Sequence, residues 1–215
     1  MADRGTTLLI WDWNGTLLDD TELCWSIANR MRAERGMPTM SDVEEYRGVF
    51  GFPVIDYYRR MGYTFAQESY EAVSEEFLAL YAAGVAGCPL QPHVRETLEE
   101  VRRRGIRQVL LSATGSDRLG GQVALFGLTD CFDEIVGGDD NLAHGKAEKA
   151  RLLMERQSAA PGETLFIGDT DHDREVAAAV GCRCALLTRG HQPKAHLGAL
   201  GVPLLGDVRE ALLWL

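Results

Sequence analysis

An apolar run that ends in a carboxylate lies near the start of the chain and reads LLIWDWNGTLLDD, residues 8–20. The run stops at Asp12, and Asn14-Gly15-Thr16 follows with the composition of a turn. A short apolar segment bounded by a glycine turn is typical of a fully buried β-strand. Because reacting groups collect at the carboxyl ends of strands in open α/β sheets, Asp12 is the first candidate for one. An aspartate in this place can also serve the turn alone.

Length and composition describe an ordinary globular protein. The chain has 215 residues, of which 46% are hydrophobic and 25% are charged, enough for one large domain or a domain with an insertion. Its formal net charge of −10, from 32 acidic and 22 basic residues, disfavours nucleic acid or an anionic membrane as the main partner. Small anionic molecules stay open as ligands, because they respond to local charge.

The sequence indicates a cytoplasmic protein. No segment approaches the roughly 20 continuous apolar residues of a membrane span, and the first residues lack the apolar region of a secretory signal. The five cysteines are odd in number and include no Cys-x-x-Cys pair, which favours buried thiols over disulfides or metal ligands. A monomer and a homodimer both fit.

Residues 19–88 carry helical signals and almost no strand signal. Asp20 is placed to cap a first helix, Ser41 opens a capping-box pattern, Pro53 suits a helix start, and Thr64 opens a further capping-box pattern. This segment is expected to be an all-helical insertion, here called the cap, between core segments 1–18 and 89–215.

From Pro89 onward the pattern alternates between helix and strand. Apolar strands are expected over residues 108–111, 134–136, 164–167 and 182–187, with helices between them and a last helix capped by Asp207. Alternation of this kind predicts an α/β fold with a doubly wound, parallel, Rossmann-like sheet covered on both faces.

Polar and charged side chains follow the ends of the expected strands. The strand ends carry Asp12, Ser112 with Thr114, Lys146, and the run from Asp169 to Asp173. A carboxylate that attacks phosphorus needs a divalent cation, donors for the phosphoryl oxygens and a positive charge to offset the transition state. The acidic groups supply the hard oxygen ligands that Mg²⁺ prefers, and Ser112 and Lys146 supply the donor and the charge.

These residues resemble the four motifs of the haloacid dehalogenase superfamily of hydrolases. The first motif, Asp-x-Asp-x-Thr, appears as residues 12–16, the second ends at Ser112, the lysine of the third matches Lys146, and the acidic fourth covers residues 168–173. The motifs occur in family order, and the helical insertion lies where the family's type-one cap sits. The sequence as a whole is similar to phosphoglycolate-phosphatase-like members of the superfamily.

The resemblance implies a small phosphorylated substrate, Mg²⁺ as cofactor and an aspartyl-phosphate formed on Asp12. The candidate catalytic residues are Asp12, Asn14, Ser112 and Lys146; the substrate-binding residues are Thr16, Ser112, Ala113, Lys146 and Arg47; and the metal site is Asp12, the backbone carbonyl of Asn14, Asp169 and Asp173. Lys149, one turn after Lys146, is the alternative for the third motif. Tyr57 and Tyr58 are expected to pack in the cap, and Asp171 and His172 to lie on a loop surface.

One position departs from the phosphatase pattern. Phosphatases of the family carry an Asp two residues after the nucleophile, where it protonates the leaving group and activates water, and this chain has Asn14. An amide cannot carry a proton between partners. Three interpretations stay open. The first is a phosphatase that is slow, is restricted to good leaving groups, or takes a proton donor from the cap or from solvent. The others are a different carboxylate-nucleophile hydrolase of the dehalogenase or phosphonatase type, and a protein that binds a phosphorylated ligand without turnover. A dinucleotide-binding fold and a phosphorelay receiver both fit the motifs poorly.

Overall fold

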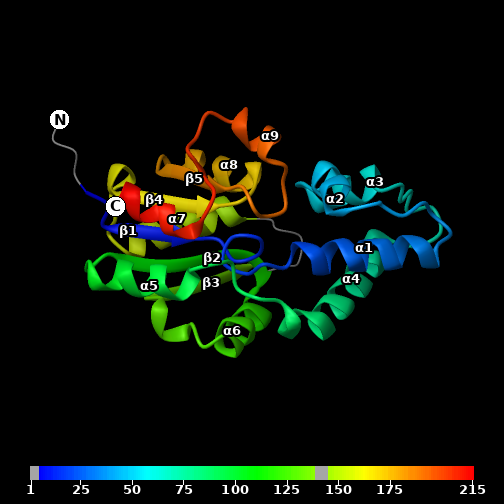
Figure 1. Cartoon of the computed structure of the whole chain (residues 1–215), viewed down its shortest axis with the longest axis horizontal. Coiled ribbons are helices and arrows are strands. Elements are labelled where there is room, and N and C mark those ends of the chain that lie inside the picture. The colour runs from blue at the N-terminus through cyan, green and yellow to red at the C-terminus, as the bar shows by residue number, and fades with distance from the viewer. Residues whose placement is uncertain (1–4, 139–144) are drawn as a thin grey trace.

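The computed structural model describes residues 5–138 and 145–215, and within them it has an α/β architecture (Figure 1). One sheet has the strand order β3-β2-β1-β4-β5-β6, and each neighbouring pair is parallel. The strands are β1 (Leu8–Trp11), β2 (Arg107–Gly115), β3 (Glu134–Gly138), β4 (Thr164–Gly168), β5 (Arg183–Leu187) and β6 (Leu204–Leu205). The doubly wound parallel sheet predicted from the sequence is therefore confirmed. β6 was not predicted, because a strand of two residues has no recognisable sequence pattern.

The apolar run at the start of the chain becomes a central strand. β1 pairs with β2 on one side and with β4 on the other, and all four of its residues are buried. A strand with neighbours on both sides and helices on both faces has no solvent-facing side, which accounts for its continuous apolar sequence. Asp12 follows directly, and its backbone N–H extends the pairing to the carbonyl of Ile167 at 2.8 Å.

Alternate strand residues face two separate helical layers. Trp11, Leu110 and Ile167 belong to a core with apolar residues of α5 (Val94–Arg103) and α6 (Ser116–Leu125). Ile10, Val109 and Phe166 belong to a second core with α7 (Lys146–Arg156) and α8 (Asp171–Val180). The sheet is thus covered on both faces, as the helix–strand alternation predicted.

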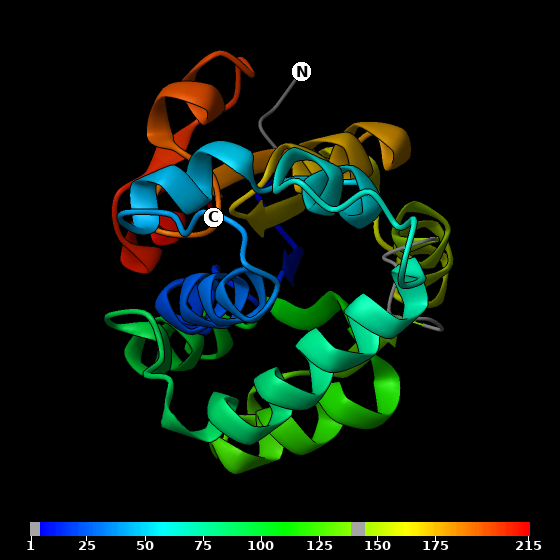
Figure 2. The same cartoon turned by 90° about the vertical axis from the view of Figure 1, so that its right-hand side faces the viewer.

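Four of the five α-helices between β1 and β2 lie together beyond one end of the sheet (Figures 1 and 2). They are α1 (Thr21–Glu34), α2 (Val43–Val49), α3 (Val54–Arg60) and α4 (Tyr70–Gly84), followed by a short 3₁₀ segment, η1 (Val85–Gly87). α1 runs between α4 and the α2–α3 pair (Figure 2).

Two helix starts differ from the predicted ones. α2 is capped by Asp42, whose side chain accepts from the Glu45 backbone N–H at 2.9 Å, one residue after the predicted cap at Ser41. α4 is capped by Ser69 and not by Thr64, because Phe65 has a φ of 57°, a left-handed conformation that a right-handed helix cannot include.

The two connections between the helices and the sheet are paired with each other. Leu18 forms an antiparallel bridge with Leu90, the Asp19 N–H donates to the Pro89 carbonyl at 2.9 Å, and the Gln91 N–H donates to Leu17 at 2.9 Å. Entry to and exit from α1–α4 therefore form one short two-chain ribbon.

The last helical segment of the chain differs in type from the predicted helix. Asp207 does cap a helical segment, with its side chain accepting from the Arg209 N–H at 2.9 Å, but that segment is a 3₁₀ helix, η4 (Val208–Trp214). It packs with α5 on the same face of the sheet. A short helix, α9 (Lys194–Gly198), precedes it and was not predicted.

All five cysteines are free, and only Cys24 is fully buried; the others are partly buried. No helix in residues 5–138 and 145–215 is both long and apolar enough to span a membrane.

Candidate active site

The predicted polar residues meet at the carboxyl ends of β1 and β4 and the neighbouring helix starts. Asp12 follows β1, Asp169 follows β4, Lys146 is the first residue of α7, and Asp173 lies in the first turn of α8. All four side chains are buried, with residue exposures from 0% to 7%. Charged groups are rarely buried this completely unless they are paired, so their mutual contacts define the site.

Lys146 joins two of the carboxylates. Its Nζ lies 2.6 Å from Asp12 Oδ1 and 2.7 Å from Asp173 Oδ1. Burial lowers the pKa of Lys146, but Asp12 and Asp173 more than offset this and raise it above the ordinary value, which keeps the ammonium charged. Gly145, with a φ of 79°, turns the chain into α7 just before the lysine. Lys149 instead donates to the Gly137 carbonyl, so Lys146 is the lysine in contact with Asp12.

Asp169 is held by the two glycine-containing turns around it. Its Oδ1 accepts from the Thr16 hydroxyl at 2.8 Å, and its Oδ2 accepts from the His191 backbone N–H at 2.7 Å. A Cβ added at Gly15 or at Gly190 would overlap this carboxylate. Both glycines are therefore required by the close approach of backbone to Asp169. Thr16, predicted to bind substrate, has its hydroxyl committed to this contact.

Asp173 is fixed by the start of α8. Thr170 and Asp173 form a capping box, and Asp173 Oδ2 also accepts from the Asp169 backbone N–H at 3.1 Å. This leaves Asp173 Oδ1 directed at Lys146. Asp171 and His172, predicted on a loop surface, lie instead in the first turn of this helix, and the His172 ring packs on Phe52 at a centroid distance of 4.6 Å.

The donor set of Asp12, Asp169 and Asp173 fits a divalent cation. One carboxylate oxygen from each lies within 4.8 Å of the others. Burial, together with the neighbouring carboxylates, raises the pKa of Asp12 to about 8 and that of Asp169 to about 6. Ionised together, these three carboxylates would carry more negative charge than Lys146 can balance, and their mutual repulsion is part of what raises the two pKa values. Hard oxygen donors with excess negative charge are the ligands that Mg²⁺ selects.

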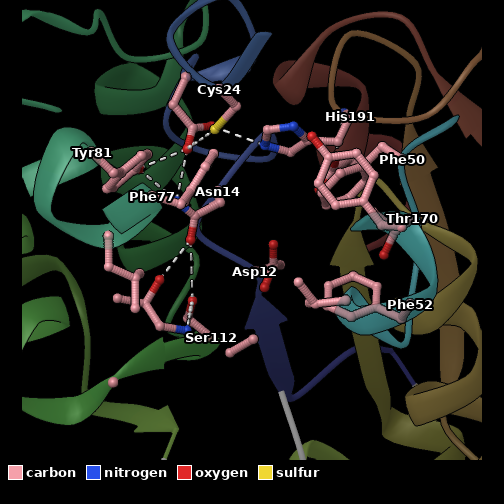
Figure 3. Close-up of a pocket in the computed structure, with 18 of the residues that line it drawn as sticks. Asp12, Asn14, Cys24, Phe50, Phe52, Phe77, Tyr81, Ser112, Thr170 and His191 are labelled. Atoms are coloured by element: carbon pink, nitrogen blue, oxygen red, sulfur yellow. Dashed lines mark hydrogen bonds and ion pairs between the residues drawn. The ribbon is translucent and has the colours of Figure 1, made fainter. Parts of the chain in front are cut away.

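Asn14 is held at both ends of its amide (Figure 3). Its Nδ2 donates to Asp20 Oδ2 at 2.8 Å and to the Tyr81 hydroxyl at 2.7 Å, and its Oδ1 accepts from the Thr114 hydroxyl at 2.7 Å. Ser112 Oγ lies 3.5 Å from the same Oδ1. A carboxylate on one side and hydroxyl donors on the other fix which end of the amide is nitrogen.

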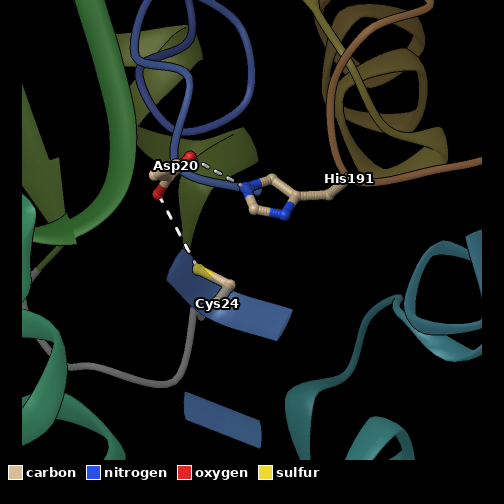
Figure 4. Close-up of side chains that lie close together, drawn as sticks. All are labelled: Asp20, Cys24 and His191. Atoms are coloured by element: carbon tan, nitrogen blue, oxygen red, sulfur yellow. Dashed lines mark hydrogen bonds and ion pairs between the residues drawn. The ribbon is translucent and has the colours of Figure 1, made fainter. Parts of the chain in front are cut away.

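Asp20 and His191 form a buried ion pair that sequence reasoning missed (Figure 4). His191 Nε2 lies 3.1 Å from Asp20 Oδ1, and His191 Nδ1 lies 2.9 Å from the Tyr46 hydroxyl. Burial lowers the pKa of His191, but Asp20 reverses this and raises it to about 9. Burial raises the pKa of Asp20, but His191 and the hydrogen bonds from Tyr81 and Asn14 hold it below the ordinary value.

The sequence offered one signal for Asp20 and none for His191. Asp20 is the N-cap residue of α1, as predicted, but its side chain makes no capping hydrogen bond. Its two oxygens accept from Asn14, Tyr81, His191 and the Gly15 backbone N–H. Cys24 also lies beside Asp20 (Figure 4), but these donors already occupy the carboxylate without an ion.

A cavity of about 180 Å³ lies over Asp12 (Figure 3). Ser112, Ala113, Lys146, Asp169 and Asp173 line it from the core side. Tyr57 and Tyr58 are buried in the packing of α1–α4 and also line the cavity. Arg47 lies away from it: its Nε donates to the Gly190 carbonyl at 2.8 Å and its guanidinium pairs with Glu44. The structure thus brings together every predicted polar residue of the site except Arg47.

A comparison with protein-family models matches residues 9–187 to the family described as haloacid dehalogenase-like hydrolase. The chain is 30% identical over 96% of its length to a phosphoglycolate phosphatase of Pseudomonas putida, of which the match covers 78%. It is 25% identical to a phosphoglycolate phosphatase of Rhodobacter capsulatus, over 89% of this chain and 88% of that one.

Solved structures share the fold. A haloacid dehalogenase-like hydrolase of Bacteroides fragilis superposes with a TM-score of 0.82 at 22% identity, covering 96% of this chain and 99% of the other. A protein of Haemophilus somnus described as a predicted phosphoglycolate phosphatase superposes with a TM-score of 0.80 at 18% identity, covering 97% of both chains.

Proposed function

The chain belongs to the haloacid dehalogenase-like hydrolases, and on this premise we propose that it is a phosphatase of small phosphorylated molecules that works through an aspartyl-phosphate on Asp12. The observation that carries the proposal is the buried contact of Lys146 with both Asp12 and Asp173. A lysine in this place keeps the Asp12 carboxylate beside a positive charge that can also receive phosphoryl oxygens.

The residues divide into attack, phosphoryl binding and support. Asp12 attacks phosphorus, and Lys146, Ser112 and the Ala113 backbone bind the phosphoryl oxygens. Thr16 acts through Asp169, whose carboxylate it orients. The likeness to the phosphoglycolate phosphatases named above supports a phosphate ester as substrate.

Asp12, Asp169 and the backbone carbonyl of Asn14 would hold Mg²⁺, with Asp173 beside them. The bound cation supplies shielding between the carboxylate and the anionic phosphoryl group. The negative charge that the three buried carboxylates would carry when ionised together supports this assignment.

Helices α1–α4 are assigned as a cap that covers the site and excludes water. Phe50 and Phe52 between α2 and α3, and Phe77 of α4, line the cavity over Asp12 (Figure 3), which supports the assignment. Exclusion of water protects a reactive acyl-phosphate until its own hydrolysis step.

The test is hydrolysis of acetyl phosphate, with and without Mg²⁺, by the wild type, Asp12→Asn, Lys146→Met and the matched control Lys149→Met. We expect Mg²⁺-dependent turnover that is lost in Asp12→Asn and reduced by about 100-fold or more in Lys146→Met, because each removes a group that contacts the phosphoryl centre. Lys149→Met should stay near wild type. Turnover that survives in Asp12→Asn would refute the proposal, and a silent wild type that still binds phosphate would favour a binding protein.

A further inference from the structure

The walls of the cavity over Asp12 differ sharply in chemistry. The cap side consists mainly of aromatic and aliphatic side chains, namely Tyr46, Phe50, Phe52, Val54, Tyr57, Tyr58, Phe77, Leu78 and Tyr81. Within the described chain, the lining residues from α1–α4 and their loops include no lysine or arginine. Phe50 and Phe52 stand on one side of Asp12, and Phe77 and Tyr81 on the other (Figure 3).

The positive groups that line the cavity come from the core and are already engaged. Lys146 contacts Asp12 and Asp173, His191 contacts Asp20, and Arg118 of α6 has an interaction of its own. A leaving group that carries a carboxylate, as glycolate does, would place that charge among aromatic walls. Burial of an unpaired charge is costly, so these walls discriminate against it.

Position 14 restricts the leaving group in a second, independent way. The Asn14 amide cannot donate a proton, and both of its ends are committed to Asp20, Tyr81 and Thr114. The ester oxygen must therefore depart without a proton from this position. Departure as an anion suits acidic leaving groups such as phenols, which ionise with a pKa of about 10, as the tyrosine side chain does.

We propose that the substrate is a phosphate monoester of a small aromatic hydroxyl compound. This inference rests on the proposed phosphatase function. An Asp12 oxygen bonds to phosphorus as the bond from phosphorus to the aryl oxygen breaks, and the electron pair leaves with the aryl oxide, which takes a proton from solvent. Water then cleaves the aspartyl-phosphate, releases inorganic phosphate and restores Asp12.

One buried hydroxyl marks where a polar substituent on the ring would bind. Tyr57 is 3% exposed and lines the cavity, and its hydroxyl has no hydrogen-bond partner among the described residues. A buried hydroxyl without a partner costs free energy that a ligand group can recover.

The experiment compares phenyl phosphate with 2-phosphoglycolate, and uses acetyl phosphate to verify the phosphoryl machinery. We expect kcat/KM for phenyl phosphate to exceed that for 2-phosphoglycolate by about tenfold or more, the discrimination that pocket contacts provide. Across substituted phenyl phosphates, kcat/KM should fall steeply as the pKa of the phenol rises. Preference for 2-phosphoglycolate by an enzyme that turns over acetyl phosphate would overturn the substrate class while leaving the phosphatase proposal intact.

A charge placed in the cap wall provides the matched test. Leu78→Lys should move the kcat/KM ratio at least tenfold toward 2-phosphoglycolate, whereas Leu125→Lys should not, because Leu125 is 58% exposed on α6 and outside the cavity lining. Binding of phenylphosphonate and phosphonoacetate, measured by calorimetry, gives the same comparison without turnover. Equal ratios in Leu78→Lys and wild type, or tighter binding of phosphonoacetate by the wild type, would refute the proposal.

Discussion

Asn14 and Asp20 have to be considered as one unit. The amide donates to the Asp20 carboxylate at 2.8 Å, and Asp20 is completely buried beside a charged His191. If position 14 carried the acid of other family phosphatases, two carboxyl groups would share that contact. Two carboxyl groups at this distance cannot both be ionised, so one of them would hold a proton at neutral pH. The amide at position 14 is therefore matched to the carboxylate at position 20.

Exchange of the two groups should restore a proton shuttle. We expect Asn14→Asp/Asp20→Asn to hydrolyse benzyl phosphate about 100-fold faster than wild type, because benzyl alcohol is a poor leaving group and general acid catalysis typically contributes at least this much. The rate of phenyl phosphate hydrolysis should increase much less. Asn14→Asp alone should be less stable than the exchange variant, because it places two carboxyl groups in the contact that Asn14 now makes with Asp20. The measurement is steady-state kinetics with Asp19→Asn as the neighbouring control, and an exchange variant no faster than wild type on benzyl phosphate would contradict the pairing.

One arginine joins the end of α1 to the start of α4. Arg35 follows the last residue of α1, and its guanidinium contacts Glu68 just before α4 at 2.6 Å and Glu76 within α4 at 2.5 Å. The side chain is 19% exposed, so these contacts are less screened than those of surface pairs. The hydrogen bonds that Arg35 donates to Glu68 and Glu76 raise its pKa above the ordinary value. The end of α1 is thus fixed against the start of α4.

Arg35→Met should lower the free energy of unfolding by about 1–2 kcal/mol, since it removes charge-assisted hydrogen bonds but keeps part of the aliphatic stem. The matched control is Arg30→Met, whose ion pair with Glu34 is exposed and should contribute little. Urea denaturation of the three proteins measures the difference. Equal losses in both variants would show that the contacts to Glu68 and Glu76 add nothing.

Local sequence patterns predicted most of the helices and strands. Contacts between residues far apart in the chain could not be predicted from them. The apolar run before Asp12 and the helix–strand alternation were enough for the parallel sheet, because both depend on short stretches of sequence. The capping-box pattern at Thr64 was misleading, because Phe65 has a left-handed backbone conformation while its ring packs against Tyr58 and Tyr63. The pairing of Asp20 with His191 joins residues at opposite ends of the chain, and no local pattern reports it.

Across the whole molecule, one loop of the core binds the cap. His191 contacts both Asp20, at the start of α1, and Tyr46 in α2, and Arg47 of α2 donates to the carbonyl of the neighbouring Gly190. The loop also supplies the backbone N–H that holds Asp169. Cap position and the acidic cluster are thereby linked through residues 190–191.

The stability of this link should depend on pH. The pKa of His191 is raised from 6.5 to about 9 in the folded protein, so its contribution is complete below about pH 6.5 and is lost as the pH rises through 9. Asp20, Asp169 and Asp12 are the carboxylates that raise it. We expect the difference in unfolding free energy between wild type and His191→Gln, measured in urea, to shrink from pH 6.5 to pH 9.5. A constant difference would show that the imidazole is not charged in the fold.

The central place of β1 has a consequence for the order in which the molecule assembles. Its partners β2 and β4 begin only at Arg107 and Thr164, so β1 cannot pair with them until these later segments have been synthesised. Domains with such non-local pairing fold slowly, whereas helices such as α1–α4 form from local contacts. Asp12 leaves the ribosome early, yet Lys146, Asp169 and His191 come long after it. A nascent chain that ends before β4 therefore cannot hold Asp12 among the side chains that surround it in the complete fold.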